Sequence, residues 1–240
     1  MSSDSVSGDE TTRTSAASEP RERRRSPSDD IWATFDCYGT LIDWNRGIRD
    51  VLADVFGDEG ADGRLQQYHA IERRLEHDGG LTYRQVLTDA LRELGAPDDR
   101  VTALADSLPS WPPFPEVPGA LRALRERGWR LAILSNTDRD YIDASMARIG
   151  VPFDLAIVAS EIGSYKPAHR HWETFFAHTG AGRDRHVHVA ASLFHDIAPA
   201  ADLGLRAVWI NRLGEASSLP RAAELTDLAR LPGVLDALVR

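Results

Sequence analysis

Lysine is almost absent from this chain of 240 residues: Lys166 is the only one, and arginine supplies the other 27 basic side chains. An ammonium group is a compact point charge, whereas a guanidinium group is a broad fork. A crowded site that contacts a carboxylate from below therefore accepts lysine and excludes arginine. The single lysine raises the question of which carboxylate it contacts.

Cysteine and long apolar runs are scarce as well. Cys37 stands alone, so no internal disulfide can form, which fits a reducing cytoplasm. No apolar run approaches the roughly 18 residues that a membrane span needs. The net charge of -9 argues against nucleic acid or an anionic membrane as the main partner. These numbers predict a cytoplasmic globular protein, and they leave room for a locally basic pocket that binds a small anion.

Residues 1–30 lack large apolar side chains almost entirely and consist mainly of Ser, Thr, Asp, Glu and Arg. Such a segment cannot bury enough surface to order itself. The sequence predicts a disordered tail there.

From Ile31 onward, short apolar runs alternate with helical patterns that often end at Gly. This alternation is typical of parallel βαβ units in an open sheet with helices on both faces, a Rossmann-like α/β fold. The predicted strands span residues 31–36, 129–136, 153–160, 186–192 and 206–212. The predicted helices between them span residues 119–128, 139–150, 168–180 and 198–204.

The stretch 46–111 differs, because it contains three helical patterns and no strand pattern. The Pro-rich segment LPSWPPFPEVPG then returns the chain to the sheet. We predict an all-helical cap at 46–111, inserted into a core formed by residues 31–45 and 112–240.

Polar side chains follow four of the predicted strands. In chain order they are Asp36 and Thr40, Ser135 and Asn136, Tyr165 and Lys166, and Ser192 and Asp196. Each pair alone is typical of a turn or a helix cap. Together they lie on one rim, because ligands of open parallel sheets bind outside the carboxyl ends of the strands.

Residue type suggests a role for each group on this rim. Asp36 is a candidate carboxylate nucleophile, kept ionised by Lys166 and hydrogen-bonded by Thr40. Ser135 and Asn136 are neutral donors suited to a substrate anion or a leaving group. Asp196 can orient Lys166 or position a hydrolytic water.

The segments FDCYGTLIDW, LAILSN, YKP and VAASLFHDIAPAADLGLRAVWINR resemble, in order, the four motifs of the haloacid dehalogenase superfamily. The resemblance covers roughly residues 31 to 215. It implies a helical cap over a Rossmann-like core, with Lys166 as the motif-three lysine beside the nucleophile Asp36.

Two departures resemble the L-2-haloacid dehalogenase branch rather than the magnesium phosphatases of that superfamily. Tyr38 stands where phosphatases have a second Asp, and Ala190 and Ala191 stand where they have Gly-Asp. A hard Mg²⁺ ion needs oxygen ligands, and the second departure removes one. The resemblance thus implies chemistry that needs no metal and no organic cofactor.

The implied mechanism is displacement of halide from a short halogenated carboxylic acid. Asp36 attacks carbon and forms an aspartyl ester, which water then hydrolyses with help from Asp196 and Lys166. The resemblance further implies that Ser135 and the backbone near Cys37 and Tyr38 bind the substrate carboxylate, and that Asn136 helps to cradle the halide.

Several positions depart from the dehalogenase pattern. Trp172 replaces a Tyr, and motif four lacks its first Ser and its Asn. The halide-binding cap arginine has two candidate positions, Arg64 by ungapped count and His69 by local similarity. Tyr83 falls near the aromatic cap residue of the family.

Other interpretations stay open. A small-molecule phosphatase would bind Mg²⁺ through Asp36 and Asp196, and a non-catalytic member would keep the fold for ligand binding. His195 is interpreted as a structural partner. The pair His186 and His188 is interpreted as surface or strand-start histidines. A homodimer is expected by analogy with the branch.

Overall fold

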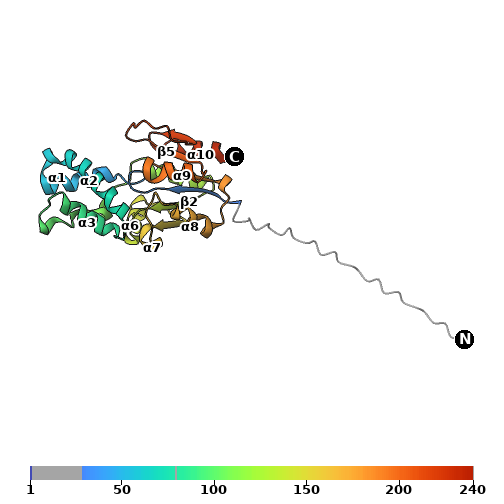
Figure 1. The fold of residues 1–240 in the computed structure, drawn as a ribbon. Coiled ribbons are helices and arrows are strands. Elements are labelled where there is room, and N and C mark those ends of the chain that lie inside the picture. Colours follow the sequence, from blue (N-terminus) through green and yellow to red (C-terminus); the bar gives the residue numbers. More distant parts are fainter. Residues whose placement is uncertain (2–28, 79, 240) are drawn as a thin grey trace.

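The structure is a computed structural model that describes residues 1, 29–78 and 80–239 (Figure 1). The disordered tail predicted for residues 1–30 lies almost entirely outside these residues. Of the helices in the described ranges, none is long and apolar enough to cross a membrane.

Within the described residues, six parallel strands form one sheet in the order β3-β2-β1-β4-β5-β6. This arrangement confirms the predicted α/β fold with a Rossmann-like open sheet. The short edge strand β6 was not predicted, because three residues carry too little pattern. The strands are β1 (Ile31–Phe35), β2 (Trp129–Ser135), β3 (Leu155–Val158), β4 (His186–Ala190), β5 (Ala207–Ile210) and β6 (Ala223–Leu225).

The strands read as continuous apolar runs because helices bury both faces of the sheet. Two hydrophobic clusters lie on opposite faces. One contains residues of α5, α6 and α10, and the other contains residues of α8 and α9. These helices are α5 (Val117–Glu126), α6 (Arg139–Ile149), α8 (Arg170–Thr179), α9 (Ala198–Asp202) and α10 (Leu231–Val239).

Between β1 and β2 the described residues form helices and no strand, as predicted. Helices α1, α2 and α3 gather at one end of the molecule, beyond the sheet (Figure 1). They are followed by a fourth, short helix. The bounds are α1 (Trp44–Phe56), α2 (Asp58–Asp78), α3 (Tyr83–Glu93) and α4 (Ala103–Ser107). Division of the chain into a separate core and cap at residues 46 and 111 stays a prediction.

The two connections between the sheet and these helices run side by side. Ile42, on the outgoing connection, forms an antiparallel bridge with Pro113 on the returning one. The amide of Asp43 donates to the carbonyl of Pro112 at 2.9 Å, and the amide of Phe114 donates to the carbonyl of Leu41 at 3.0 Å. The helices therefore join the sheet through one narrow, hydrogen-bonded strip.

A carboxylate from the sheet side caps α3. Asp138 lies in the turn between β2 and α6, and its two oxygens accept the amides of Tyr83 and Arg84 at 3.0 Å each. These amides belong to the first turn of α3, where backbone donors lack helical partners. Asp138 therefore fixes the start of α3, including Tyr83, relative to the end of β2.

We predict that Gly47→Ala destabilises the protein although alanine favours helices. A Cβ at Gly47 in α1 would lie 2.4 Å from Cγ of Trp111, and overpacking of this kind costs about 1–3 kcal/mol. The matched control is Gly119→Ala in α5, where no atom lies within 4 Å of the added carbon. The control should gain up to about 1 kcal/mol. Chemical denaturation measures both, and equal effects would contradict the packing argument.

Candidate active site

Asp36 lies directly after the central strand β1, at the carboxyl edge of the sheet. Its Oδ2 accepts the hydroxyl of Thr40 at 2.8 Å, and its Oδ1 accepts Nζ of Lys166 at 2.8 Å. Thr40 is itself oriented, because the amide of Ala191 donates to its Oγ1 at 2.9 Å. The turn between them needs Gly39, which has φ +86° and packs against Trp44. The turn after β1 thus folds back so that the hydroxyl of Thr40 reaches the carboxylate of Asp36.

Lys166 has no free donor. Its three N–H groups point to Oδ1 of Asp36, to Oδ1 of Asp196 at 2.7 Å and to the carbonyl of Leu134 at 2.9 Å. The side chain is 2% exposed. A planar guanidinium cannot direct its donors to three acceptors around one point. This geometry explains why a lysine is required at this position.

Asn136 holds Lys166 in place. Its Oδ1 accepts the amide of Lys166 at 2.6 Å, and its Nδ2 donates to the carbonyl of Lys166 at 3.0 Å. One side-chain amide therefore satisfies both backbone groups of the lysine. The predicted role of Asn136 as part of a halide cradle stays a prediction, although its side chain also lines the cavity described below.

The two carboxylates around Lys166 differ in acidity. Burial alone would raise the pKa of Asp196, but Lys166 and His188 outweigh it and hold that pKa below its usual range. For Asp36, burial is the largest influence, and its pKa is raised although Lys166 pulls it down. Burial also opposes the charge of Lys166, yet Asp196 and Asp36 keep its pKa above the ordinary value. Asp196 is therefore the more firmly ionised partner, and Asp36 is the more basic carboxylate.

A buried hydrogen-bond chain supports Asp196 from below. Nε2 of His188 lies 3.0 Å from Oδ1 of Asp196, and its Nδ1 lies 2.8 Å from Oγ1 of Thr34. Nε2 of His186 lies 2.8 Å from the same hydroxyl. Of the two interpretations given for these histidines, the strand-start position is confirmed for His186, which begins β4, and the surface position was wrong, because both side chains are fully buried. Their positions two residues apart on β4 place both rings on the face that Thr34 of β1 shares.

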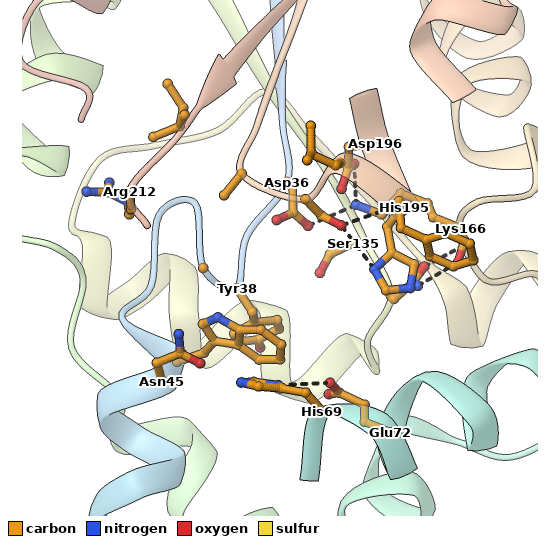
Figure 2. A pocket seen from close by; sticks show the side chains of 18 of the residues that line it. Asp36, Tyr38, Asn45, His69, Glu72, Ser135, Lys166, His195, Asp196 and Arg212 are labelled. Carbon is orange, nitrogen blue, oxygen red and sulfur yellow. Dashed lines mark hydrogen bonds and ion pairs between the residues drawn. The ribbon is translucent and has the colours of Figure 1, made fainter. Parts of the chain in front are cut away.

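A cavity of about 580 Å³ opens in front of Asp36 (Figure 2). Asp36, Ser135 and Asp196 lie on its sheet side, and His69 and Glu72 of α2 face them across it. Of the predicted residues, those lining the cavity are Asp36, Tyr38, Tyr83, Ser135, Asn136, Lys166 and Asp196. The cavity thus brings most of the predicted site together.

Ser135 offers the cavity a donor that is not used by any other described residue. Its hydroxyl is buried and, among the described residues, has no hydrogen-bond partner. A buried polar group without a partner is costly and needs an explanation. A ligand oxygen in the cavity would supply the missing partner.

Two predicted residues act from behind the cavity wall. Thr40 reaches the site only through Asp36. The side chain of Cys37 is fully buried and is absent from the lining residues. Burial raises the pKa of its thiol well above the usual value, which disfavours a thiolate nucleophile. Any contribution of Cys37 to binding therefore comes from its backbone.

Two glutamates of α2 were missed by the sequence reasoning. Glu72 accepts the hydroxyls of Tyr68 and Tyr83 at 2.9 and 2.7 Å on the same oxygen. Glu76 lies 3.3 Å from both Nδ2 of Asn136 and Nε2 of His195, and burial with the charge of Glu72 raises its pKa well above the usual value. The spacing of His69, Glu72 and Glu76, at i, i+3 and i+7, was the available signal.

The two candidates for the halide-binding position occupy different surroundings. The guanidinium of Arg64 lies over the ring of Phe56 at 4.3 Å, and Arg64 is not among the lining residues. His69 lines the cavity, with its ring 4.7 Å from that of Trp44. Within residues 29–78 and 80–239, no group of three or more His, Cys, Asp or Glu side chains is arranged to hold a metal.

We predict that Lys166→Met destabilises the protein by about 3–5 kcal/mol at neutral pH, because it leaves two buried carboxylates without a cation. The lowered pKa of Asp196 stabilises the wild type above the pKa of an unfolded Asp, and this contribution is lost as pH falls through the folded pKa. In the variant both carboxyl groups take up protons more readily.

The stability deficit of Lys166→Met should therefore narrow as pH falls toward about 4, because the two carboxyl groups of the variant take up protons above the pKa of an unfolded Asp. Denaturant unfolding across pH 3.5–8 measures it, with Lys166→Met/Asp196→Asn as the control that removes one orphan charge. If the loss in free energy of unfolding relative to wild type does not change with pH, the charge argument is contradicted.

Comparisons with known proteins agree with this geometry. A family model for a haloacid dehalogenase-like hydrolase matches residues 32–204. An (S)-2-haloacid dehalogenase of Pseudomonas sp. (strain YL) is 32% identical over 197 residues, which cover 75% of this chain and 82% of the relative. Haloacetate dehalogenase H-2 of Moraxella sp. (strain B) is 30% identical over 194 residues, which cover 76% of this chain and 86% of that protein.

The fold agrees as well. The crystal structure of the L-2-haloacid dehalogenase RSc1362 superposes with a TM-score of 0.76 at 23% sequence identity, covering 86% of this chain and 99% of that one. The family model spans more than half of the chain and includes Asp36, Lys166 and Asp196. On these grounds the protein belongs to the family of haloacid dehalogenase-like hydrolases.

Proposed function

We propose that the protein hydrolyses the carbon–halogen bond of short 2-haloacids without a metal, through an ester on Asp36. The observation that carries the proposal is a carboxylate that Thr40 and Lys166 fix in the wall of the cavity, together with the unpartnered hydroxyl of Ser135. The similarity to an (S)-2-haloacid dehalogenase of Pseudomonas and a haloacetate dehalogenase of Moraxella supports it.

The first step is displacement at carbon. An oxygen of Asp36 attacks C2 of the substrate, a C–O bond forms, and the C–X bond breaks with its electron pair leaving on the halide. The raised pKa of Asp36 makes the ionised carboxylate the more nucleophilic of the pair. Thr40 and Lys166 hold its plane toward the cavity, which is the orientation that displacement requires.

The second step is hydrolysis of the ester. Water adds to the carboxyl carbon of Asp36 and passes one proton to Asp196. The bond between this carbon and the ester oxygen then breaks, Asp196 returns the proton to that oxygen, and the 2-hydroxyacid leaves. The second proton of water, now on the carboxyl group of Asp36, passes to solvent. Lys166 and Thr40 stabilise the negative charge that develops on the carboxyl oxygens. The free carboxylate of Asp36 is restored.

Charge in the cavity orients the substrate. Glu72 on α2 disfavours a carboxylate on its side of the cavity, so the substrate carboxylate faces Ser135 and the backbone N–H groups of Cys37 and Tyr38. The halogen then lies toward His69. The aromatic pair Tyr38 and Tyr83, with ring centroids 6.0 Å apart, forms the apolar wall between the two ends.

The alternative of a magnesium phosphatase would use Asp36 and Asp196 as metal ligands. The ammonium of Lys166 already lies between them, contacting one oxygen of each, and no observation favours a metal there. A cytoplasmic location, a homodimer and the core-and-cap division stay predictions.

The decisive test is halide release from chloroacetate, bromoacetate, fluoroacetate and L-2-chloropropionate in EDTA. We expect release in EDTA that Asp36→Asn lowers by at least about 10³-fold, since the nucleophile is gone. p-Nitrophenyl phosphate with Mg²⁺ is the parallel assay. Phosphate release that needs Mg²⁺, without halide release, would overturn the proposal.

His69 should affect turnover and Arg64 should not. We expect His69→Ala to lower kcat/KM for L-2-chloropropionate by about tenfold or more, the worth of one hydrogen bond to an anion. Arg64→Ala is the control on the same helix, and its kcat/KM should stay within about twofold, the scatter of a remote surface change. The reverse ranking would place the halide near Arg64 instead.

A further inference from the structure

The two oxygens of Asp196 have unequal surroundings. Oδ1 accepts Lys166 Nζ at 2.7 Å and lies 3.0 Å from Nε2 of His188. Oδ2 is buried and has no hydrogen-bond partner among the described residues, although Asp196 lines the cavity. A buried carboxylate oxygen without a donor is costly, and water is the donor that the proposed hydrolysis would bring to it.

When each imidazole carries a single proton, the hydrogen-bond chain below Asp196 has one direction. Carboxylate oxygens only accept, so Nε2 of His188 carries the proton and Nδ1 is an acceptor. The hydroxyl of Thr34 must then donate to Nδ1 of His188, and it accepts from Nε2–H of His186. In this arrangement Nδ1 of His186 is a lone pair, and it is the ring nitrogen of His186 that has no partner among the described residues.

The chain ends at a neutral ring, that of His186. Burial lowers the pKa of His186 well below the usual value, which keeps that ring neutral. The ring of Trp172 packs against the ring of His188 in an edge-to-face contact, with centroids 5.2 Å apart. His188 is thus held at both nitrogens and on one face.

We propose that His188 is a positioning residue for ester hydrolysis, which donates from Nε2 to Oδ1 of Asp196 and so leaves Oδ2 to bind and deprotonate the attacking water. This inference rests on the proposed function. It assigns a purpose to the fully buried sequence HVH, which the displacement step does not use.

The two half-reactions depend differently on this contact. During displacement Asp36 is charged, and Lys166 is shared by two carboxylates. After the ester has formed, Asp36 is neutral and Asp196 alone receives the proton from water. A loosely held Asp196 therefore slows hydrolysis much more than halide release, and the ester accumulates on Asp36.

Two substitutions at the same position separate the contact from the packing. His188→Gln places its amide N–H near the former Nε2 and can still donate to Asp196. His188→Asn ends near the former Nδ1, toward Thr34, and is too short to reach Asp196. Thr34→Val is a third variant that leaves His188 in place but removes the hydroxyl that fixes its tautomer.

The experiment is a rapid-quench turnover of the full chain with bromoacetate, which follows halide release while intact-mass spectrometry measures the ester on Asp36. We expect His188→Asn to release about one halide per chain at near wild-type rate and then hydrolyse at least about tenfold more slowly, with the ester accumulating. His188→Gln should stay within about threefold of wild type. Thr34→Val should lie between them.

Equal losses in both half-reactions, or equal losses in the Gln and Asn variants, would overturn the inference and leave His188 a packing residue. Circular dichroism checks that each variant is folded. If His188→Asn does not fold, Thr34→Val still tests the inference. The absence of halide release from wild-type protein overturns the proposed function itself. A normal halide burst in every variant without ester accumulation overturns only the role of His188.

Discussion

The site depends on one buried cation shared by two buried carboxylates. Lys166 satisfies Asp36, Asp196 and a backbone carbonyl with its three donors, and burial of this many charges is tolerable only when each is paired and hydrogen-bonded. Much of the surrounding structure serves that condition. Asn136 hydrogen-bonds both backbone groups of the lysine. Thr40 provides a second hydrogen bond to Asp36, and His188 provides one to Asp196.

Sharing one cation also gives the two carboxylates, Asp36 and Asp196, different pKa values. One ammonium cannot lower the pKa of both neighbours equally, and the extra donor from His188 tips the balance toward Asp196. The result is a more basic carboxylate on β1 and a firmly ionised one after β4. In the proposed mechanism, the nucleophile and the general base are therefore distinguished by their hydrogen-bond partners rather than by residue type.

The sequence predicted the parts of this arrangement that depend on strand ends. Apolar runs that stop at polar residues located Asp36, Ser135 and Asp196 on one rim, and the lone lysine identified its partner. The sequence could not predict which segments that are far apart along the chain lie side by side in the fold. Thr34 and the two histidines meet only because β1 and β4 are neighbours in the sheet, and a mid-strand Thr looks like any other strand residue. Glu72 and Glu76 belong to a polar helix, and the sequence does not show which face of that helix packs over the sheet and becomes buried.

The structure also shows why the helical segment cannot be treated as an accessory. Glu72 and Glu76 form the wall opposite the nucleophile, and Tyr83 is fastened to the sheet side through Asp138. Under the proposed function, α2 therefore selects the substrate by charge, whereas the residues at the strand ends break the bond. Changes in α2 can alter which acids are accepted without altering how they react.

The rarity of lysine has a practical consequence. The chain offers a single ε-amine, and that amine is 2% exposed and fully hydrogen-bonded. Amine-directed labels, cross-linkers and acetylating agents therefore meet no side-chain target on the folded surface. Modification of Lys166 by such a reagent reports opening of the site, so the protein contains its own probe of local unfolding.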